Sequence, residues 1–101
     1  MTITSSQLEE AVLVALRPAG LRDRLFRTLY PGLSPRQVLG RLPSAMAEEL
    51  LAGDPREMVA RREALDRISR ALYTHVDAGR VSRTRRRLKT AMVDCFALVR
   101  R

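Results

Sequence analysis

The sequence predicts one domain of the α+β class, mainly helical, with a β-hairpin at its C-terminal end. Its 101 residues are the length of one ordinary domain, here spanning 1–101. Hydrophobic residues make up 46 % of the chain but aromatic residues only 4 %, so the core must be aliphatic, which disfavours an all-β sandwich. Apolar residues recur at helical spacing as far as Gly79, and the pattern changes after it.

The N-terminal part predicts two helices. Ser6 and Glu9 have the spacing of a capping box, and an apolar stripe follows, which together predict a helix over about 6–17. That stripe consists of Leu8, Ala11, Val12, Ala15 and Leu16. Pro18 and Gly20 end this helix, and a second is expected over 21–30, before Pro31 and Gly32. Its apolar residues are Leu21, Leu25, Phe26 and Leu29, with Phe26 and Tyr30 as expected anchors.

A third helix is expected over 34–42. Ser34 suits the N-cap, and Pro35 suits the first helical position, where the missing amide hydrogen has no cost. Val38, Leu39 and Leu42 provide its apolar face. The residues that follow, 44–51, allow one or two further helical turns with Met46, Leu50 and Leu51 facing inward.

A long amphipathic helix is the clearest element and is expected over 55–78. Asp54 and Pro55 repeat the N-terminal signal, and Gly79 ends the helix. Its apolar stripe consists of Met58, Leu65, Ile68, Leu72 and Val76.

Residues 80–99 predict a β-hairpin, because two short runs rich in β-forming residues flank a polar link at Lys89 and Thr90. The link has no glycine, so a loop of three to five residues is expected and the register stays open. A terminal helix is the alternative. It is disfavoured because the nearly consecutive positive charges of 82–87 would repel one another on a helix.

The charge of the chain is concentrated at one end. Lys and Arg number 19 and Asp and Glu 11, a net charge of +8. Residues 80–101 contain eight basic residues against Asp94 alone, so +7 of that charge lies there, and Asp94 can neutralise one or two of them at most. Such a patch indicates an anionic partner such as nucleic acid. Arginine suits bidentate contacts to phosphate or guanine, although a GC-rich genome explains the arginine bias equally well.

A helix that ends in glycine and leads into a strand is followed by a basic segment and a second strand. The residues are Leu65, Ile68, Leu72, Val76, Gly79 and Val81, then Arg85, Arg86, Arg87, Leu88 and Lys89, then Val93 to Val99. This pattern resembles the winged-helix (winged helix-turn-helix) DNA-binding domain of small bacterial transcriptional regulators. The resemblance covers about 34–99. It departs from the pattern in the helix at 21–30 and in an insertion at 43–55 between the second and third helices of the motif.

The resemblance implies sequence-specific binding of double-stranded DNA by a regulator of transcription or replication. The long helix would enter the major groove and the hairpin, as the wing, would contact phosphate or the minor groove. The implied contacts on the helix are Arg61, Arg62, Arg67, Ser69 and Arg70, with Arg62 and Arg70 first for base edges, and those on the wing are Arg80, Arg83, Arg85, Arg86, Arg87 and Lys89. Glu63 and Asp66 could instead hold the helix arginines in local ion pairs on a solvated face.

Two other functions stay open: a protein-interaction module whose hairpin binds an acidic protein partner, and an RNA-binding protein. A homodimer is expected, because the first helix is apolar on more than one side through Val12, Leu13, Val14 and Leu16, and because many winged-helix regulators are dimers.

No enzymatic motif, metal-ligand set or cofactor motif is found, so we expect no catalytic activity, no metal and no cofactor. His75 is expected to have a structural role at a helix end, and Cys95 to be a small buried hydrophobe. Tyr30 and Tyr73 are expected in the core or at its rim. The longest apolar run, 11–16, is too short to cross a bilayer, and no signal peptide is evident, so a cytoplasmic protein without membrane contact is expected.

Overall fold

The computed structural model describes residues 3–18, 20–22, 24–25, 32–51, 58–88 and 90–99. Its elements in chain order are α1 (Ser5–Ala15), α3 (Pro35–Arg41), α4 (Ser44–Leu50), α5 (Met58–Asp77), β1 (Val81–Leu88) and β2 (Ala91–Leu98). Residues 21, 22, 24 and 25 are also helical. The expected α+β class with a C-terminal hairpin is confirmed.

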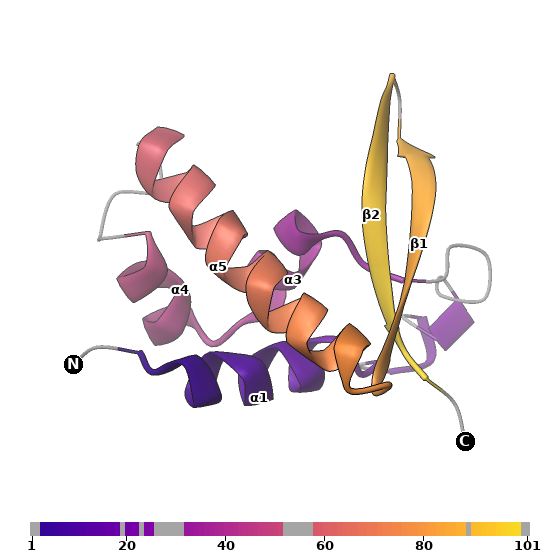
Figure 1. The fold of residues 1–101 in the computed structure, drawn as a ribbon, viewed down its shortest axis with the longest axis horizontal. Helices are drawn as coiled ribbons and strands as arrows, with labels where there is room; N and C mark the ends of the chain where they lie inside the picture. Colours follow the sequence, from indigo (N-terminus) through magenta and orange to yellow (C-terminus); the bar gives the residue numbers. More distant parts are fainter. Residues whose placement is uncertain are drawn as a thin grey trace.

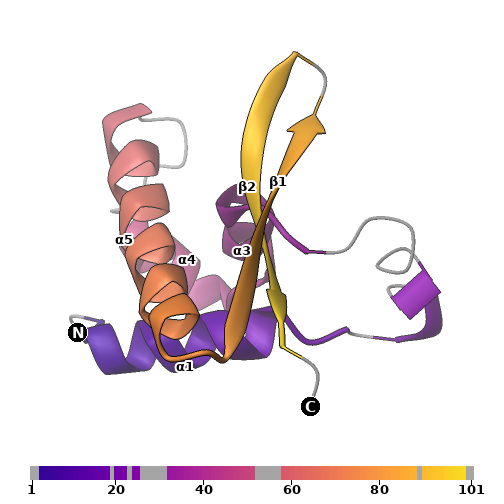
Figure 2. The same ribbon diagram turned by 45° about the vertical axis from the view of Figure 1, so that its right-hand side comes forward.

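Helix α5 runs through the middle of the molecule and packs against α1, α3, α4 and β1. Figures 1 and 2 show α1 crossing below α5, α4 beside its N-terminal half, and the hairpin rising from its C-terminal end, with the outer half of the hairpin extending beyond the helices. Among the described residues, the core between these elements is aliphatic apart from the aromatic ring of Phe96. Val12, Leu16, Val38, Ile68 and Phe96 are almost fully buried. None of the described helices is long and apolar enough to cross a membrane.

Helix α1 starts two residues earlier than the expected capping box. Thr4 is the N-cap: its hydroxyl accepts a hydrogen bond from the Gln7 amide at 3.2 Å, and the Gln7 side chain accepts one from the Thr4 amide at 3.0 Å. The prediction of Ser6 with Glu9 was wrong because the sequence offers two overlapping boxes. Starting at Thr4 places Ile3 and Leu8 in the positions of a hydrophobic staple, and both are buried in the core.

Helix α3 begins as predicted, with Ser34 as N-cap and Pro35 at the first helical position. A full capping box forms at this N-terminus: the Ser34 amide donates a hydrogen bond of 2.9 Å to Gln37 Oε1, and the Gln37 amide donates one of 3.3 Å to the Ser34 hydroxyl. Val38 is fully buried, Leu42 nearly so, and Leu39 partly. Helix α4 confirms the helical turns allowed over 44–51, and Leu50 is its buried residue. Of the helix predicted over 21–30, the positions 23 and 26–30, including Phe26 and Tyr30, lie outside the described residues.

Helix α5 buries a different face at its start from the one predicted. Ile68 and Leu72 are buried as expected, but small residues such as Ala60 and Ala64 complete the buried face, whereas Met58 is 79 % exposed. Small side chains let α5 lie close to the surrounding helices, so a stripe chosen by side-chain size missed them. The last helical residue is Asp77, and Gly79, with a φ of +77°, terminates the helix. Its left-handed conformation allows the Arg80 amide to donate a hydrogen bond to the His75 carbonyl and the Gly79 amide to donate one to the Val76 carbonyl.

The hairpin pairs antiparallel from Val81 with Leu98 to Leu88 with Ala91. This register leaves two residues between the strands, so the expected loop of three to five residues was wrong; the absence of glycine disfavours such a short link but does not forbid it. Beside β2, Leu33 forms an isolated antiparallel bridge to Phe96, with two backbone hydrogen bonds of 2.8 Å. Leu33 therefore lies against the edge of β2 opposite to β1, and it ties the start of α3 to the hairpin.

Candidate nucleic-acid interface

The arginines of β1 lie on two faces of the hairpin. Directly paired residues share a face of an antiparallel ribbon and successive residues alternate, so the register places Arg83, Arg85 and Arg87 on one face with Asp94. Arg86 lies on the other face and is half-buried, whereas Arg83, Arg85 and Arg87 are exposed. Asp94 is the only acidic residue in either strand. The strands therefore carry a positive charge that one carboxylate cannot balance.

Asp94 contacts the two arginines nearest the base of the hairpin. Its carboxylate lies 3.6 Å from Arg83 Nη1 and 3.3 Å from Arg85 Nε. The second contact is one of charge rather than a hydrogen bond, because Asp94 Oδ1 has no partner in hydrogen-bonding geometry. The expectation that Asp94 neutralises one or two cations is confirmed. Arg87, nearer the end of the hairpin, has neither of these contacts to Asp94.

Tyr73 of α5 joins this cluster to the helix. Its hydroxyl donates a hydrogen bond of 2.9 Å to Asp94 Oδ2 and accepts one of 3.4 Å from Arg83 Nη1. Its ring packs edge-to-face on Phe96, with centroids 5.4 Å apart, and the Arg83 guanidinium lies 5.9 Å from the ring centroid. The hydrogen bond and electrostatic interaction of Arg83 with Tyr73, followed by the charge of Asp94, raise the pKa of Arg83. Tyr73 is 37 % exposed, at the rim of the core as expected.

The predicted contact residues of α5 fall into two groups. Arg61, Arg62 and Ser69 lie beside open surface pockets on the side of α5 that faces α3 and the hairpin. Arg61 and Arg62 are exposed, and within the described residues neither forms an ion pair with Glu63 or Asp66. The alternative in which local ion pairs hold these two arginines therefore has no support in the described part of the chain.

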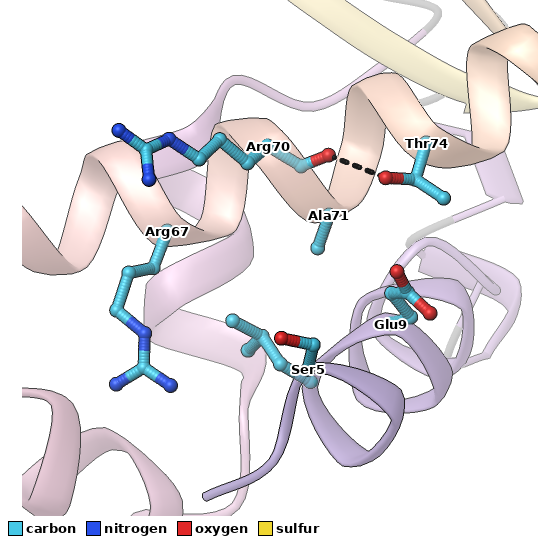
Figure 3. A pocket seen from close by; sticks show the side chains of 7 residues that line it. Ser5, Glu9, Arg67, Arg70, Ala71 and Thr74 are labelled. Carbon is cyan, nitrogen blue, oxygen red and sulfur yellow. Dashed lines mark hydrogen bonds between the residues drawn. The ribbon is translucent and has the colours of Figure 1, made fainter.

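Arg67 and Arg70 form the second group and line a small pocket of about 200 Å³ between α5 and α1. Figure 3 shows the side chain of Arg67 extending from α5 toward the chain just before α1, where its Nη2 donates a hydrogen bond of 3.1 Å to the Ile3 carbonyl. The Arg70 carbonyl accepts a hydrogen bond of 3.0 Å from the Thr74 hydroxyl, and the Arg70 side chain is exposed. The structure does not bring these two arginines together with Arg61, Arg62 and Ser69.

An open groove of about 670 Å³ separates α5 from the outer half of β2. Its walls are Leu65, Asp66 and Ser69 of α5, Ala91 and Val93 of β2, and the residues at the start of α3, Ser34 to Arg36. Figure 1 shows the arrangement: the N-terminal half of α5 and the hairpin diverge from a common base, with α3 between them. The groove and the pocket beside it are bordered by Arg36 of α3 and by Arg61 and Arg62 of α5, and the hairpin contributes Ala91 and Val93 to the groove.

Arg36 is a residue of this site that the sequence reasoning missed. It is exposed on α3 and lines both pockets on the side of α5 that faces α3. The sequence did contain a signal for it: Arg36 is a basic residue two positions after the predicted N-cap Ser34, where a side chain is expected at the exposed start of a helix. Its proximity to Arg61 and Arg62 depends on how α3 packs on α5. Of the remaining predicted wing residues, Arg80 is exposed where α5 turns into β1, and Lys89 lies outside the described residues.

His75 and Cys95 belong to the core and not to the site. His75 is 4 % exposed, and its Nε2 lies 2.7 Å from the Glu9 carbonyl oxygen, which joins α5 to α1, so a structural role near the helix end is confirmed. Cys95 is fully buried, as predicted for a small hydrophobe. No group of three or more potential metal ligands occurs among the residues described.

Comparison of the chain with models of protein families, with curated proteins and with solved structures found no match. The geometry of this site is therefore the basis on which its function is inferred.

Proposed function

We propose that this protein binds double-stranded DNA, with the N-terminal half of α5 directed at the major groove and the hairpin following the phosphate backbone or the minor groove. The observation that carries the proposal is the hairpin itself. It extends beyond the helical body (Figure 1) and exposes Arg83, Arg85 and Arg87 on the face that holds Asp94. A rigid ribbon with this charge suits a polyanion, because each phosphate contact releases condensed counterions.

The second support is the relation of the hairpin to α5. The major groove of B-form DNA is about 12 Å wide and admits one helix, whereas the deep, narrow major groove of A-form RNA does not. Arg61 and Arg62 are exposed on the side of α5 that borders the groove next to the hairpin. Helix and hairpin can therefore contact one duplex together, and an arginine can pair with guanine through two parallel hydrogen bonds.

The third support is the order of the described elements, helices followed by a C-terminal hairpin, which agrees with the order that the resemblance implies. The bridge between Leu33 and Phe96 adds an extended segment against β2, directly before α3, that the resemblance did not include. A role in regulating transcription or replication is part of this proposal and rests on the resemblance.

The test is fluorescence anisotropy with a random DNA duplex and the matched RNA duplex over a salt series. The variant Arg85→Ala/Arg87→Ala removes two exposed charges of the hairpin, and its control, Arg17→Ala/Arg22→Ala, removes two exposed charges far from it in sequence. We expect the hairpin variant to weaken DNA binding and to lower the salt slope by about two, roughly one for each phosphate contact removed, and the control to change it little.

Three outcomes would contradict the proposal. Equal losses in the two variants would mean that binding follows net charge alone. Tighter binding of the RNA duplex would favour the RNA-binding alternative. Binding to neither duplex at low salt would leave the interaction module with an acidic protein partner as the better explanation.

A further inference from the structure

The side of the molecule formed by α1 and α4 has the opposite charge to the hairpin. These two helices contain Glu9, Glu10, Glu48 and Glu49 and no lysine or arginine, in a chain whose net charge is +8. Figure 1 shows α4 on the side of α5 away from the hairpin and α1 below α5, with the outer half of the hairpin pointing away from both. A partner bound to α1 and α4 would therefore leave the proposed DNA-binding surface open.

An open apolar groove lies between these two helices. Its volume is about 550 Å³, and its apolar lining is contributed by Ile3, Ala11, Val14, Pro43, Ala45 and Met46. Val14 is 60 % exposed, although it belongs to a helix whose other large apolar residues are buried or packed against the core. Gln7, Glu10 and Glu49 complete the lining, so the polar rim is acidic.

We propose that this groove binds a basic amphipathic helix of a partner protein. Helices bind in such grooves through apolar side chains spaced three and four residues apart. Here Ala11 and Val14 on one wall and Ala45 and Met46 on the other would contact those side chains. Lysine or arginine residues on the flanks of the bound helix would lie near Glu10 and Glu49, and such charge complementarity selects the partner and its orientation.

A second copy of this chain fits the groove less well. In a two-fold symmetric dimer the same surface occurs on both sides of the interface. The glutamates of one rim would then face those of the other copy, with no basic residue in α1 or α4 to separate them. The homodimer expected from the sequence stays a prediction, and the charge of this groove disfavours it as the dimer interface.

The test uses two synthetic peptides of about 15 residues, each with leucines at helical spacing, one with arginine and one with glutamate at the flanking positions. A third peptide has the composition of the arginine peptide in scrambled order. Binding to the full chain is followed by fluorescence anisotropy at physiological salt and mapped by amide chemical shifts. We expect only the ordered arginine peptide to bind, with the shifts confined to α1 and α4.

The variants locate the binding site. Val14→Glu should weaken binding of the arginine peptide by about tenfold or more, and Leu21→Glu, which changes another exposed apolar residue, should not. Glu10→Arg should reduce the preference for the arginine peptide over the glutamate one. DNA binding by Val14→Glu should equal that of the parent chain, which separates this proposal from the proposed function.

Three results would overturn the proposal: equal binding of the scrambled peptide, shifts outside α1 and α4, or no binding. Sedimentation of the chain alone gives a fourth. A concentration-dependent dimer that Val14→Glu abolishes would show that the occupant of the groove is a second copy.

Discussion

The Tyr73 hydroxyl donates a hydrogen bond of 2.9 Å to the Asp94 carboxylate and so joins the last turns of α5 to the middle of β2. The same carboxylate contacts Arg85, which lies opposite it on β1, and Arg83, two residues away on the same face. One tyrosine thus orients the acid that orients two arginines. Because the base of the hairpin is held in this way, its outer half has a defined direction relative to α5, as a surface that contacts one duplex at two places requires.

Replacing Tyr73 with Phe tests this link. The ring contact with Phe96 is kept and the hydroxyl is removed, so we expect the free energy of unfolding to fall by about 0.5–1 kcal/mol, the lower part of the range for one hydrogen bond, as Tyr73 is partly exposed. The raised pKa of Arg83 adds a pH prediction. The contribution of protonated Arg83 to the free energy of unfolding is complete below the ordinary arginine pKa and is lost only as the pH rises through the raised pKa. Urea unfolding should therefore give the same loss at about pH 6 and about pH 9, and a loss confined to one pH would contradict this.

Replacing Asp94 with Asn should change DNA binding in the opposite direction to the removal of an arginine. Arg83 and Arg85 lose their counter-charge and become available to phosphate, so we expect tighter binding and a salt slope steeper by about one to two. The control is Asp77→Asn, which makes the same charge change at the end of α5, outside the strands. If the two variants tighten binding equally in anisotropy titrations, Asp94 acts only through net charge.

Two glycines should respond to alanine with opposite signs. Gly32 has a φ of +91°, and a Cβ there would lie 3.2 Å from the Phe96 amide nitrogen and 3.2 Å from Cys95 Cβ. Gly32→Ala should therefore lower the free energy of unfolding by about 1–3 kcal/mol. Gly40 lies inside α3, and a Cβ there meets nothing within 4 Å. Gly40→Ala should therefore raise the free energy of unfolding by about 0.5–1 kcal/mol. Thermal unfolding of the two variants checks this, and equal signs would contradict it.

His75 should be important for stability. His75→Ala removes the contact of its Nε2 with the Glu9 carbonyl and the packing of a buried side chain between α5 and α1, at a cost of about 1–3 kcal/mol. The control is Thr74→Ala, which removes an exposed hydroxyl bonded to the Arg70 carbonyl and should change stability by about 0.5 kcal/mol or less. Urea unfolding compares the two, and equal losses would show that His75 does not link α1 to α5.

Local signals in the sequence were sufficient to predict most of the elements. The N-cap at Ser34, the helix end at Gly79 and the two strands follow from patterns within a few residues of each feature. Where two local signals overlapped, as at Thr4 and Ser6, the packing of Ile3 and Leu8 decided between them. Met58 was assigned to the core because its spacing fits the stripe, but the buried face of α5 is set by the helices around it.

Non-local relationships could not be predicted in this way. The bridge from Leu33 to Phe96, the bond from Tyr73 to Asp94 and the position of Arg36 beside Arg61 join segments far apart in the chain. The candidate site shows the same limit: its arginines were identified from composition and periodicity, but which of them share a side of α5 depends on the packing of α1 and α3.

The division of the α5 arginines gives the most direct test of the proposed function. Arg61→Ala/Arg62→Ala and Arg67→Ala/Arg70→Ala each remove two positive charges from the same helix. The first pair lines a pocket with Arg36 of α3, next to the groove between α5 and the hairpin, and the second lines the pocket against α1. Under the proposed function, the first pair contacts the duplex that the hairpin also contacts. Its removal should therefore weaken binding of a selected DNA sequence by about 1–3 kcal/mol for each arginine that pairs with a base.

The second pair should act on stability instead, because Arg67 holds the Ile3 carbonyl. Anisotropy at a salt concentration that suppresses non-specific binding, together with urea unfolding of each variant, separates the two effects. If Arg67→Ala/Arg70→Ala abolished sequence preference while Arg61→Ala/Arg62→Ala kept it, the side of α5 that faces α1 would be the one that reads DNA. The hairpin and the recognition surface would then have to bind separate molecules or separate sites.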